Sequence, residues 1–287
     1  MNFVIGARGR LGRAIVASSL PGQVTAPERQ VYANWWRDGA ADDISRFFEK
    51  SALGDAIVFV AAGILDPGLP TDEHQAINFL LAKHVVEGAG ALGLRVVTFG
   101  TVTEKLLDGN TSNPYISSKI RLANFVEAYS ANQPLPLHIR IHTLYGGGLP
   151  PSFMFLGQIL QAMGSRSEFR MSPGSQLREY HHIDDEISAI VRLATSPLSG
   201  VVDLSHGAPV TLKELATYVF SGLGCTDQLK IGALAEPLRE NYGTVFERNP
   251  LLVDLQFRPT LAGVADYLSL CRKQFNPGEQ AAGRVGQ

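Results

Sequence analysis

Short apolar runs alternate with longer amphipathic segments through the first half of the chain. The apolar runs are rich in β-branched and aromatic residues, as buried strands are, and they lie at 3–5, 23–26, 56–60, 94–99 and 137–141. The amphipathic segments predict helices, and they lie at 11–20, 42–51, 71–90 and 114–129. Asp42 is the expected N-cap of the second helix, and a further strand is predicted at 31–35. Because this alternation forms βαβ units, the sequence predicts an α/β fold with a doubly wound parallel sheet.

The pattern changes after the glycine- and proline-rich segment 146–151. Helical patterns dominate the second half, with strands predicted at 177–182 and 201–204. We expect a first domain over 1–150 and a small C-terminal α/β substrate lobe over 151–276, interleaved with the first domain. The last segment, 277–287, is rich in glycine, alanine and glutamine and is expected to be disordered.

Composition argues against several classes of function. The formal net charge of -2 and the pI of about 6.4 provide no basic field for a nucleic-acid backbone, so no nucleic-acid partner is expected. Cys225 and Cys271 lack metal-ligand spacing, so no metal site is expected and both should be reduced core residues. The longest apolar stretch, 56–62, is too short to span a bilayer, and the chain opens on a predicted strand rather than a leader. A cytoplasmic protein without a membrane partner is the expectation.

A glycine-rich loop follows the first strand and opens the first helix. Gly6, Gly9 and Gly12 allow a tight turn, close approach to a pyrophosphate, and packing of the helix against the strand. The helix N-terminus adds N–H groups and the positive end of a dipole. An ordinary glycine turn is the alternative, but the strand–turn–helix context favours a Rossmann-type dinucleotide site. The residues expected to contact the cofactor here are Gly6, Arg8, Gly9, Arg10, Leu11 and Gly12.

The second strand ends near a carboxylate and an arginine, Glu28 and Arg29. A carboxylate there binds the ribose 2′-OH of NAD, whereas an arginine favours the 2′-phosphate of NADP. Arg8 in the loop and Arg37 further along add positive charge near such a phosphate. The sequence therefore predicts NADP(H) as the preferred cofactor, with NAD(H) as the alternative.

Tyr115 and Lys119 are four residues apart on a predicted helix and so share one face. A phenol is a weak acid, and a nearby ammonium is expected to lower its pKa, so that it can exchange a proton with a carbonyl oxygen. Thr101 supplies a hydroxyl just beyond a strand's carboxyl end, where ligands bind in such sheets, with Thr98 as the alternative. A surface tyrosine near a lysine is commonplace, but the order of glycine loop, strand-end hydroxyl and helix pair favours a catalytic trio.

These residues resemble the extended short-chain dehydrogenase/reductase family, and within it the NAD-dependent epimerase/dehydratase branch, whose members mostly act on nucleotide sugars. Asp55 with the segment Ala61, Ala62 and Gly63 is similar to the family's fourth-strand motif, and Asn78 to an asparagine on the following helix. The resemblance implies that Ala61, Ala62, Gly63 and Asn78 lie along the cofactor, and that Lys119 also bonds the nicotinamide ribose. The loop with its arginine is similar to that of GDP-fucose synthases, in which the arginine serves NADP.

Two further segments extend the resemblance. The first, from Arg140 to Gly146, is similar to the family's Arg-Pro-x-x-x-Tyr-Gly, with isoleucine in place of proline. The second, at 174–185, is similar to a block of the substrate lobe in which Arg178 would contact the nucleotide diphosphate of the substrate. The alternative for Arg178 is a structural ion pair with Asp184 or Asp185.

The resemblance also assigns roles to two residues after the sixth strand of the family's sheet. His142 is expected to line the nicotinamide pocket, and Thr143 to contact the substrate together with Thr101 and Arg178. The family further implies a homodimer formed through two helices of each subunit, one of which carries Tyr115.

Departures from the family narrow the reaction. Thr101 is followed by Val102 and Thr103, with Glu104 only later, so the acid and base of the 4,6-dehydratases are missing. Both cysteines lie far from the motifs, which disfavours 3,5-epimerisation. We therefore expect an NAD(P)H-dependent reductase of a nucleotide-activated 4-keto-6-deoxysugar, with Tyr115 as general acid. The alternatives are a C4 epimerase with tightly bound NAD and a non-catalytic dinucleotide-binding regulator on the same fold.

Overall fold

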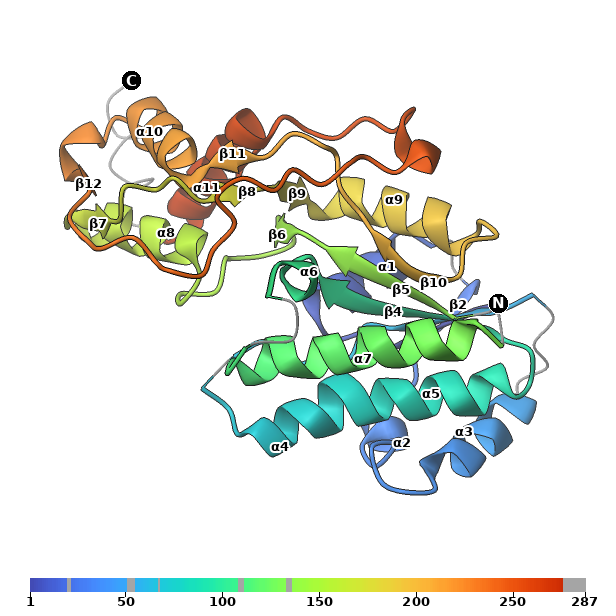
Figure 1. Cartoon of the computed structure of the whole chain (residues 1–287). Helices are drawn as coiled ribbons and strands as arrows, with labels where there is room; N and C mark the ends of the chain where they lie inside the picture. Colours follow the sequence, from blue (N-terminus) through green and yellow to red (C-terminus); the bar gives the residue numbers. More distant parts are fainter. Residues whose placement is uncertain (20–21, 51–54, 67, 108–110, 133–135, 276–287) are drawn as a thin grey trace. The chain divides into compact units, whose positions relative to one another are not determined.

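The computed structural model of the chain (Figure 1) describes residues 1–19, 22–50, 55–66, 68–107, 111–132 and 136–275. The chain divides into two compact units. Unit 1 comprises residues 1–141, 187–204 and 249–253, and unit 2 comprises 142–186, 205–248 and 254 onward. The chain thus leaves unit 1 after Ile141 rather than near residue 150, and it returns for two later segments, 187–204 and 249–253. The expected disordered tail at 277–287 lies outside the described residues.

Unit 1 is built around a parallel sheet. In the described part of the chain this sheet has six strands, hydrogen-bonded in the order β10-β5-β4-β3-β1-β2. The strands are β1 (Asn2–Ile5), β2 (Val24–Thr25), β3 (Ile57–Val60), β4 (Arg95–Thr101), β5 (Leu137–Ile141) and β10 (Gly200–Asp203). β1 pairs with β2 on one side and β3 on the other, so the order of strands reverses at β1, and ligands bind beyond the carboxyl ends of the strands at such a point in open α/β sheets. The predicted Rossmann-type α/β fold is confirmed.

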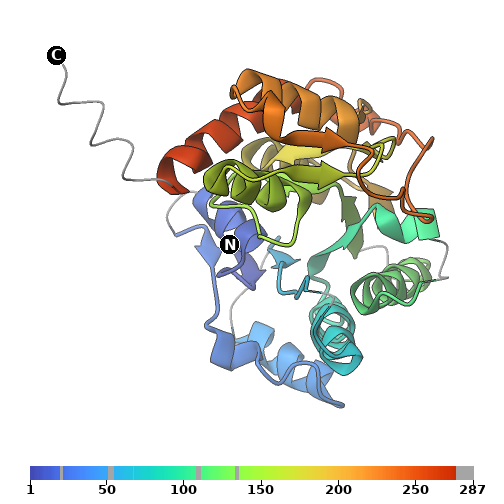
Figure 2. The same ribbon diagram turned by 90° about the vertical axis from the view of Figure 1, so that its left-hand side faces the viewer.

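Helices of unit 1 connect these strands. They are α1 (Arg10–Ala17), α2 (Arg29–Tyr32), α3 (Ala40–Glu49), α4 (Thr71–His74), α5 (Leu81–Gly90), α6 (Thr103–Leu107) and α7 (Pro114–Ser130), with a π-helical segment (Gln75–Leu80) joining α4 to α5 and a 3-10 turn at Pro250–Leu252. Figure 1 shows α5 and α7 side by side, and Figure 2 shows the same two helices nearly end-on. Strand side chains such as Phe3 and Val58 pack with Val85 and Val126 of these helices in one buried core.

Two local predictions in unit 1 were wrong. The segment expected to form a strand at 31–35 is the end of α2 followed by turns. Its buried side chains, Tyr32 and Trp35, are three residues apart, which is a helical spacing rather than the alternation of a strand. Gly39, with φ of 78°, precedes α3 as its N-cap, so Asp42 lies within the first turn instead and favours the helix dipole from there.

Unit 2 contains three short ladders and three helices among its described residues. The ladders pair β6 (Thr143–Tyr145) with β9 (Tyr180–His182), β7 (Phe169–Met171) with β12 (Leu229–Ile231), and β8 (Leu177–Arg178) with β11 (Val210–Thr211). The helices are α8 (Phe155–Ser165), α10 (Leu212–Gly222) and α11 (Thr260–Phe275), with a 3-10 turn at Thr226–Gln228, and α9 (Ile183–Ala194) begins here and continues in unit 1. The rings of Phe155, Phe169 and Phe220 stand 5.5 Å apart in succession at the centre of the core.

The strand predicted at 201–204 does not belong to the second lobe. It is β10, which pairs in parallel with β5 and completes the edge of the large sheet. Cys225 and Cys271 are buried thiols that form no disulfide within the described residues. Among the described helices, none has both the length and the apolar character needed to cross a bilayer.

Candidate active site

β4 carries Thr101 to the carboxyl edge of the sheet. Thr101 is the last residue of this strand and pairs with Ile141 of β5, so it lies within the strand rather than just beyond it. Its hydroxyl donates to Thr103 Oγ1 at 3.2 Å. The alternative, Thr98, is fully buried and bonds His138 Nδ1 at 2.8 Å, so its hydroxyl already has an interior partner. The structure therefore favours Thr101 as the strand-end hydroxyl.

Helix α7 carries Tyr115 and Lys119 one turn apart. Asn113 caps the helix by accepting the Ile116 N–H at 3.3 Å, which fixes where the first turn begins. Lys119 is only 8% exposed, and its Nζ donates to the carbonyl oxygen of Phe99 at 2.8 Å. This bond ties α7 to the end of β4, so the structure brings the three members of the predicted trio to one edge of the sheet.

Burial and a neighbouring carboxylate set the protonation of the pair on α7. Burial lowers the pKa of Lys119 to about 8, and the charge of Glu104 opposes this effect. Burial raises the pKa of Tyr115 above its ordinary value, and Glu104 raises it further. The predicted lowering of the Tyr115 pKa by Lys119 is therefore wrong, because desolvation dominates and the ammonium bonds a backbone carbonyl instead. At neutral pH Tyr115 is a neutral phenol, the form that donates a proton.

Glu104 is a buried carboxylate whose contacts sequence reasoning missed. It lies in α6, and its side chain is 1% exposed. One oxygen accepts the N–H of Thr101 at 2.6 Å, and the other lies 3.1 Å from Arg140 Nε and 3.3 Å from His138 Nε2. Both oxygens are thus committed to the protein interior. The sequence shows only an acid three residues after the end of β4. Its partners His138 and Arg140 are on β5, which comes much later in the chain, so the spacing does not reveal the contacts.

The glycine loop has the close approaches that a dinucleotide loop requires. Gly6 has φ of +91°, and a Cβ on it would lie 2.3 Å from Ala62 N. A Cβ on Gly12 would lie 2.3 Å from the carbonyl oxygen of Gly6, so α1 packs directly on the end of β1. Gly9 is the N-cap of α1, and no side chain caps that helix start. Arg10 begins the helix. These observations fit a pyrophosphate bound at the loop.

The loop after β3 begins beside the end of β1. The Ala61 N–H donates to the Ile5 carbonyl at 2.8 Å, which holds the start of this loop against β1. Asn78, 1% exposed, accepts the Ile64 N–H at 2.9 Å and donates to Ser118 Oγ at 3.2 Å. The Asn78 amide therefore holds the loop that contains Ala61, Ala62 and Gly63, and its own contact with the cofactor stays a prediction.

The residues expected to discriminate NAD from NADP are on the surface of unit 1. Glu28 is exposed and accepts a hydrogen bond from Gln30 at 2.8 Å. Arg29 begins α2 and is exposed, as is Arg8 in the glycine loop. Leu11, in the first turn of α1, is half-buried. The sheet order thus leaves both an acid and arginines near the carboxyl end of β2.

Unit 2 contains the predicted substrate arginine. Arg178 forms an ion pair with Glu240, and neither side chain is fully buried. The expected alternative, a pair with Asp184 or Asp185, does not form, because these two acids contact Arg258 instead. A half-exposed pair of this kind contributes little to stability. Replacing Glu240 by another anion as the partner of Arg178 would therefore cost little folding stability.

His142 and Thr143 also lie in unit 2. The ring of His142 packs 5.3 Å from that of His181 and 5.2 Å from that of Phe246, and its Nε2 lies 3.7 Å from Glu179. These contacts place the His142 ring against a buried cluster of unit 2, and its role at the nicotinamide stays a prediction. Thr143, half-buried, donates its N–H to the carbonyl of Glu179 at 3.3 Å.

This buried cluster is an ion-pair network that the sequence did not reveal. His181 Nδ1 lies 2.6 Å from Glu186, and its Nε2 lies 3.0 Å from Glu179. Burial lowers the pKa of His181, but Glu186 and Glu179 outweigh it and raise the pKa to about 9. Burial raises the pKa of Glu179, but His181 and its other donors lower it to about 2. The cluster therefore holds a protonated imidazole between two acids.

The same cluster places three potential metal ligands, from Glu179, His181 and His206, within 4.8 Å of one another. Both ring nitrogens of His181 face carboxylates. His206 Nδ1 accepts the Ala208 N–H at 3.1 Å, and its Nε2 lies 3.4 Å from Thr260 Oγ1. Since these groups satisfy one another, the arrangement favours an internal hydrogen-bond network over metal ligation.

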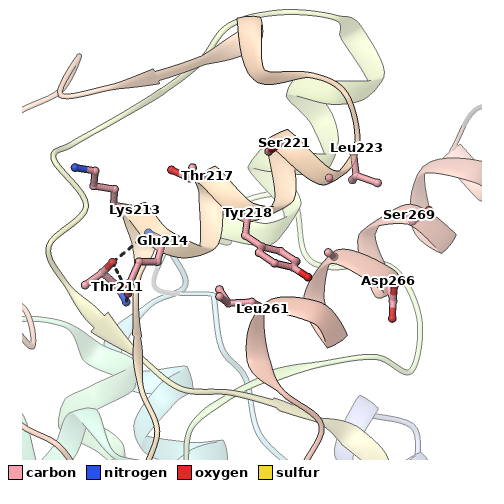
Figure 3. Close-up of a pocket in the computed structure, with 12 residues that line it drawn as sticks. Thr211, Lys213, Glu214, Thr217, Tyr218, Ser221, Leu223, Leu261, Asp266 and Ser269 are labelled. Carbon is pink, nitrogen blue, oxygen red and sulfur yellow. Dashed lines mark hydrogen bonds between the residues drawn. The ribbon is translucent and has the colours of Figure 1, made fainter.

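A groove of about 1110 Å³ lies between α10 and α11 in unit 2. Figure 3 shows Tyr218 of α10 extending toward α11, where Leu261 and Asp266 line the opposite wall. None of the residues lining this groove was predicted as a site residue, and none belongs to the trio on β4 and α7. The groove is therefore separate in sequence and unit from the candidate active site.

Comparisons with solved structures identify the fold across nearly the whole chain. dTDP-4-dehydrorhamnose reductase from Bacillus anthracis, solved with NADP, is 17% identical with a TM-score of 0.71, covering 94% of this chain and 98% of its own. UDP-N-acetylglucosamine 4-epimerase from Methanobrevibacter ruminantium is 15% identical with a TM-score of 0.72, covering 96% of each chain. dTDP-glucose 4,6-dehydratase from Streptomyces venezuelae, solved with NAD, is 17% identical with a TM-score of 0.70, covering 96% of this chain and 99% of its own. At these identities the likeness shows a shared fold.

No curated protein sequence matches the chain. Residues 2–204 match the family described as the NAD dependent epimerase/dehydratase family. That range includes the glycine loop, β4, α7 and the block around Arg178, which are the segments that carried the resemblance in the sequence. The chain therefore belongs to the NAD-dependent epimerase/dehydratase family and is an enzyme of the NAD(P)-dependent type.

Proposed function

We propose that this enzyme reduces a nucleotide-activated 4-keto-6-deoxysugar with NADPH. The observation that carries the proposal is a buried, neutral phenol, Tyr115, one turn from Lys119 on α7, with the nearby carboxylate of Glu104 enclosed by other partners. A ketoreductase needs one proton donor beside a hydride source. A dehydratase, which eliminates water from the sugar, would need a further acid–base group. Glu104 does not offer one, because its oxygens are bonded to Thr101, His138 and Arg140.

The residues of the trio divide the work of reduction. The bound nicotinamide supplies the hydride. The Thr101 hydroxyl orients the carbonyl oxygen of the substrate, and Tyr115 donates its phenolic proton to that oxygen. Lys119, with its pKa at about 8, is mostly charged at neutral pH and stabilises the phenolate that remains.

The substrate class is proposed from the relatives of the fold. The similar structures include a reductase, a 4-epimerase and a 4,6-dehydratase whose names specify dTDP- or UDP-linked substrates. In this chain Arg178 would contact the diphosphate, releasing Glu240, and Thr143 would contact the sugar side. We expect Arg178→Ala to raise KM with a smaller effect on kcat, because its contact is present before and during the reaction.

The cofactor preference is tested by binding. NADPH and NADH are titrated by fluorescence into wild type, Arg8→Ala and Arg13→Ala, where Arg13 is an exposed arginine one turn further along α1. A charge-assisted hydrogen bond contributes about 1.5–3 kcal/mol, so Arg8→Ala should weaken NADPH binding about tenfold or more and leave NADH binding unchanged. Arg13→Ala should bind both as wild type does. Equal binding of NADPH and NADH by wild type would contradict the preference.

Turnover is tested with dTDP- and UDP-linked 4-keto-6-deoxyglucose, following NADPH absorbance. Wild type should consume NADPH, and Tyr115→Phe should bind NADPH normally with activity lost. NAD that remains bound through purification, without NADPH consumption, would point to a C4 epimerase. Cofactor binding without turnover of any keto-sugar would point to a regulator.

We also propose that the enzyme is a homodimer formed through α5 and α7. On α7, Phe125 and Tyr129 are partly buried, and their rings lie 5.5 Å apart. Light scattering after size exclusion should give twice the chain mass, and Phe125→Asp should yield a monomer. A wild-type monomer at micromolar concentration would contradict the proposal.

A further inference from the structure

Glu104 is bonded to the backbone of the very residue that carries the strand-end hydroxyl. α6 starts two residues after Thr101, and this short connection folds the carboxylate back onto the Thr101 N–H at 2.6 Å. With a side chain that is 1% exposed, the bond is shielded from water. A charge-assisted bond in such surroundings is among the stronger ones available to a backbone N–H. It restricts where the end of β4 can lie.

Gly100 provides the space for this arrangement. A Cβ at this position would lie 2.1 Å from the Glu104 carboxylate and 2.2 Å from His138 Nε2. The glycine therefore lets both side chains rest against the strand backbone. The preceding residue, Phe99, accepts the bond from Lys119. Two charged side chains from different helices thus hold the last three residues of β4.

The carboxylate is anchored from behind by two adjacent strands. Its second oxygen lies 3.3 Å from His138 Nε2 and 3.1 Å from Arg140 Nε, both on β5. Arg140 in turn reaches Asp203 of β10 at 3.4 Å. Burial raises the pKa of Glu104, but His138, the Thr101 N–H and Lys119 outweigh burial and lower the pKa below its ordinary value. Glu104 is therefore a fixed negative charge at neutral pH.

That charge acts on the two titratable members of the trio. It raises the pKa of Lys119 against the lowering by burial, and it adds to the raised pKa of Tyr115. The other charged or titratable groups around this region are His74 beside the Tyr115 ring, His138, Arg140, Asp203 and Lys105. Glu104 is the charged group that raises the pKa of both Tyr115 and Lys119.

We propose that Glu104 is a positioning residue of the catalytic centre, which fixes Thr101 through the backbone and supplies the negative charge that balances Lys119 at the end of β4. The role in turnover rests on the proposed reductase function. The electrostatic role is a property of the folded chain and is measurable without substrate. Because the Glu104 side chain is 1% exposed and both of its oxygens face protein groups, it acts through the trio.

The test compares Glu104→Gln, which keeps shape and removes charge, with Glu104→Asp, which keeps charge and shortens the reach to Thr101. Glu127→Gln is the matched control, since Glu127 is an exposed acid on α7 that bonds the Val201 N–H. Lysine side chains are labelled with ¹⁵N, the Lys119 signal is assigned with Lys119→Arg, and its pKa is measured by NMR titration. kcat and KM are then measured against pH with the keto-sugar.

In Glu104→Gln, the Lys119 pKa should fall below its wild-type value, because the charge that raises it is gone. The pH profile of kcat should shift to lower pH accordingly. In Glu104→Asp, the Lys119 pKa should stay near wild type while kcat falls by up to about 100-fold, the effect of misplacing a catalytic group by an ångström. Neither variant should change NADPH affinity, and Glu127→Gln should match wild type throughout. A Lys119 titration unchanged in Glu104→Gln overturns the electrostatic role, and an unchanged kcat in Glu104→Asp overturns the positioning role.

Failure of the proposed function gives a different result. If wild type reduces no keto-sugar, the reductase assignment fails while the Lys119 titration still decides the role of the Glu104 charge. If Glu104→Gln does not fold, the comparison of Glu104→Asp with wild type and Glu127→Gln decides the positioning role.

Discussion

At the scale of single residues, the site combines groups whose protonation is set by burial. Lys119 is a buried ammonium with its pKa lowered to about 8, and the folded state therefore disfavours its charged form. A buried ammonium of this kind costs stability, as groups in functional sites often do. This makes the stability of the protein depend on pH in a specific direction.

The first prediction follows from that linkage. Between pH 8 and 10.5 the unfolded chain binds the Lys119 proton and the folded chain does not, so the stability of wild type rises with pH in this window. Lys119→Met lacks this titration. Wild type should therefore gain about 3 kcal/mol relative to Lys119→Met from below pH 8 to above pH 10.5, at 1.36 kcal/mol per unit. Urea unfolding at several pH values measures the difference, with Lys83→Met as the control for loss of a lysine.

A constant difference between wild type and Lys119→Met across the window would contradict the prediction. The prediction would also be contradicted if the stability difference between wild type and Lys83→Met changed with pH in the same way. Lys83 is the control because its side chain is 28% exposed and pairs with Glu87 on α5.

The sequence names the candidate trio but not the surroundings that the structure gives these residues. Thr101, Tyr115 and Lys119 could be named because their order and spacing are local. The raised pKa of Tyr115 could not, because it depends on burial by distant segments and on Glu104. Glu104 in turn depends on His138 and β5, more than thirty residues later. Chemistry that arises from pairing of remote strands leaves no short-range signal.

At the scale of elements, the glycine loop shows how tightly a strand and a helix must meet. Gly12 lies on α1 with its missing side chain directed at the Gly6 carbonyl. Gly9 is different, because a Cβ there would have its nearest neighbour at 3.5 Å and its φ of -72° suits any residue. The two glycines therefore have separable roles, the one in packing and the other in approach to the phosphates.

The second prediction is a contrast between two alanine variants. Gly12→Ala should destabilise unit 1 by about 1–3 kcal/mol, since a methyl group cannot fit against backbone without moving α1. Gly9→Ala should fold with nearly wild-type stability and bind NADPH more weakly, because its methyl group projects where a pyrophosphate approaches. Thermal unfolding and NADPH titration of both variants measure this. Equal losses of stability would show that the two positions do not differ as the structure indicates.

Element prediction succeeded where periodicity was clear. The strands at 57–60 and 137–141 were found because β-branched runs stand out, and α7 because Asn113 and a following proline mark its start. The short α2 was mistaken for a strand, since four residues are too few to display a helical period. The π-helical segment within the helix at 71–90 was not foreseen, because one extra residue per turn hardly alters an apolar pattern.

At the scale of the whole molecule, the chain crosses between its two units more often than the sequence indicated. The fold class followed from alternation, but β10 was assigned to the wrong unit because its partner β5 lies some sixty residues earlier. The histidine cluster of unit 2 was missed for the same reason. Glu179 and Glu186 flank His181 closely in sequence, whereas His142 and His206 approach from remote segments. Contacts of high sequence separation are what the sequence alone leaves open.

The third prediction concerns that cluster. The pKa of His181 is raised to about 9, above the value of 6.5 for an ordinary histidine, so its stabilising contribution is fully present below pH 6.5 and is lost as pH rises through 9. Removing one member of a buried ion-pair network costs about 3–5 kcal/mol because the remaining charges stay buried. His181→Leu, which leaves Glu179 and Glu186 facing each other, should lose about that much at pH 6.

The loss should shrink as pH rises, because above pH 9 the wild-type imidazole is also neutral and no longer offsets the two carboxylates. Urea unfolding at pH 6, 8 and 10 measures the trend. His182→Gln is the matched control, since His182 is the next residue of β9 and contacts Asp184, whose side chain is 68% exposed, a type of pair worth little in water. A loss in His181→Leu that stays constant from pH 6 to 10 would mean that His181 acts through packing alone. A loss that shrinks only in His181→Leu would show that the charge on this imidazole stabilises unit 2.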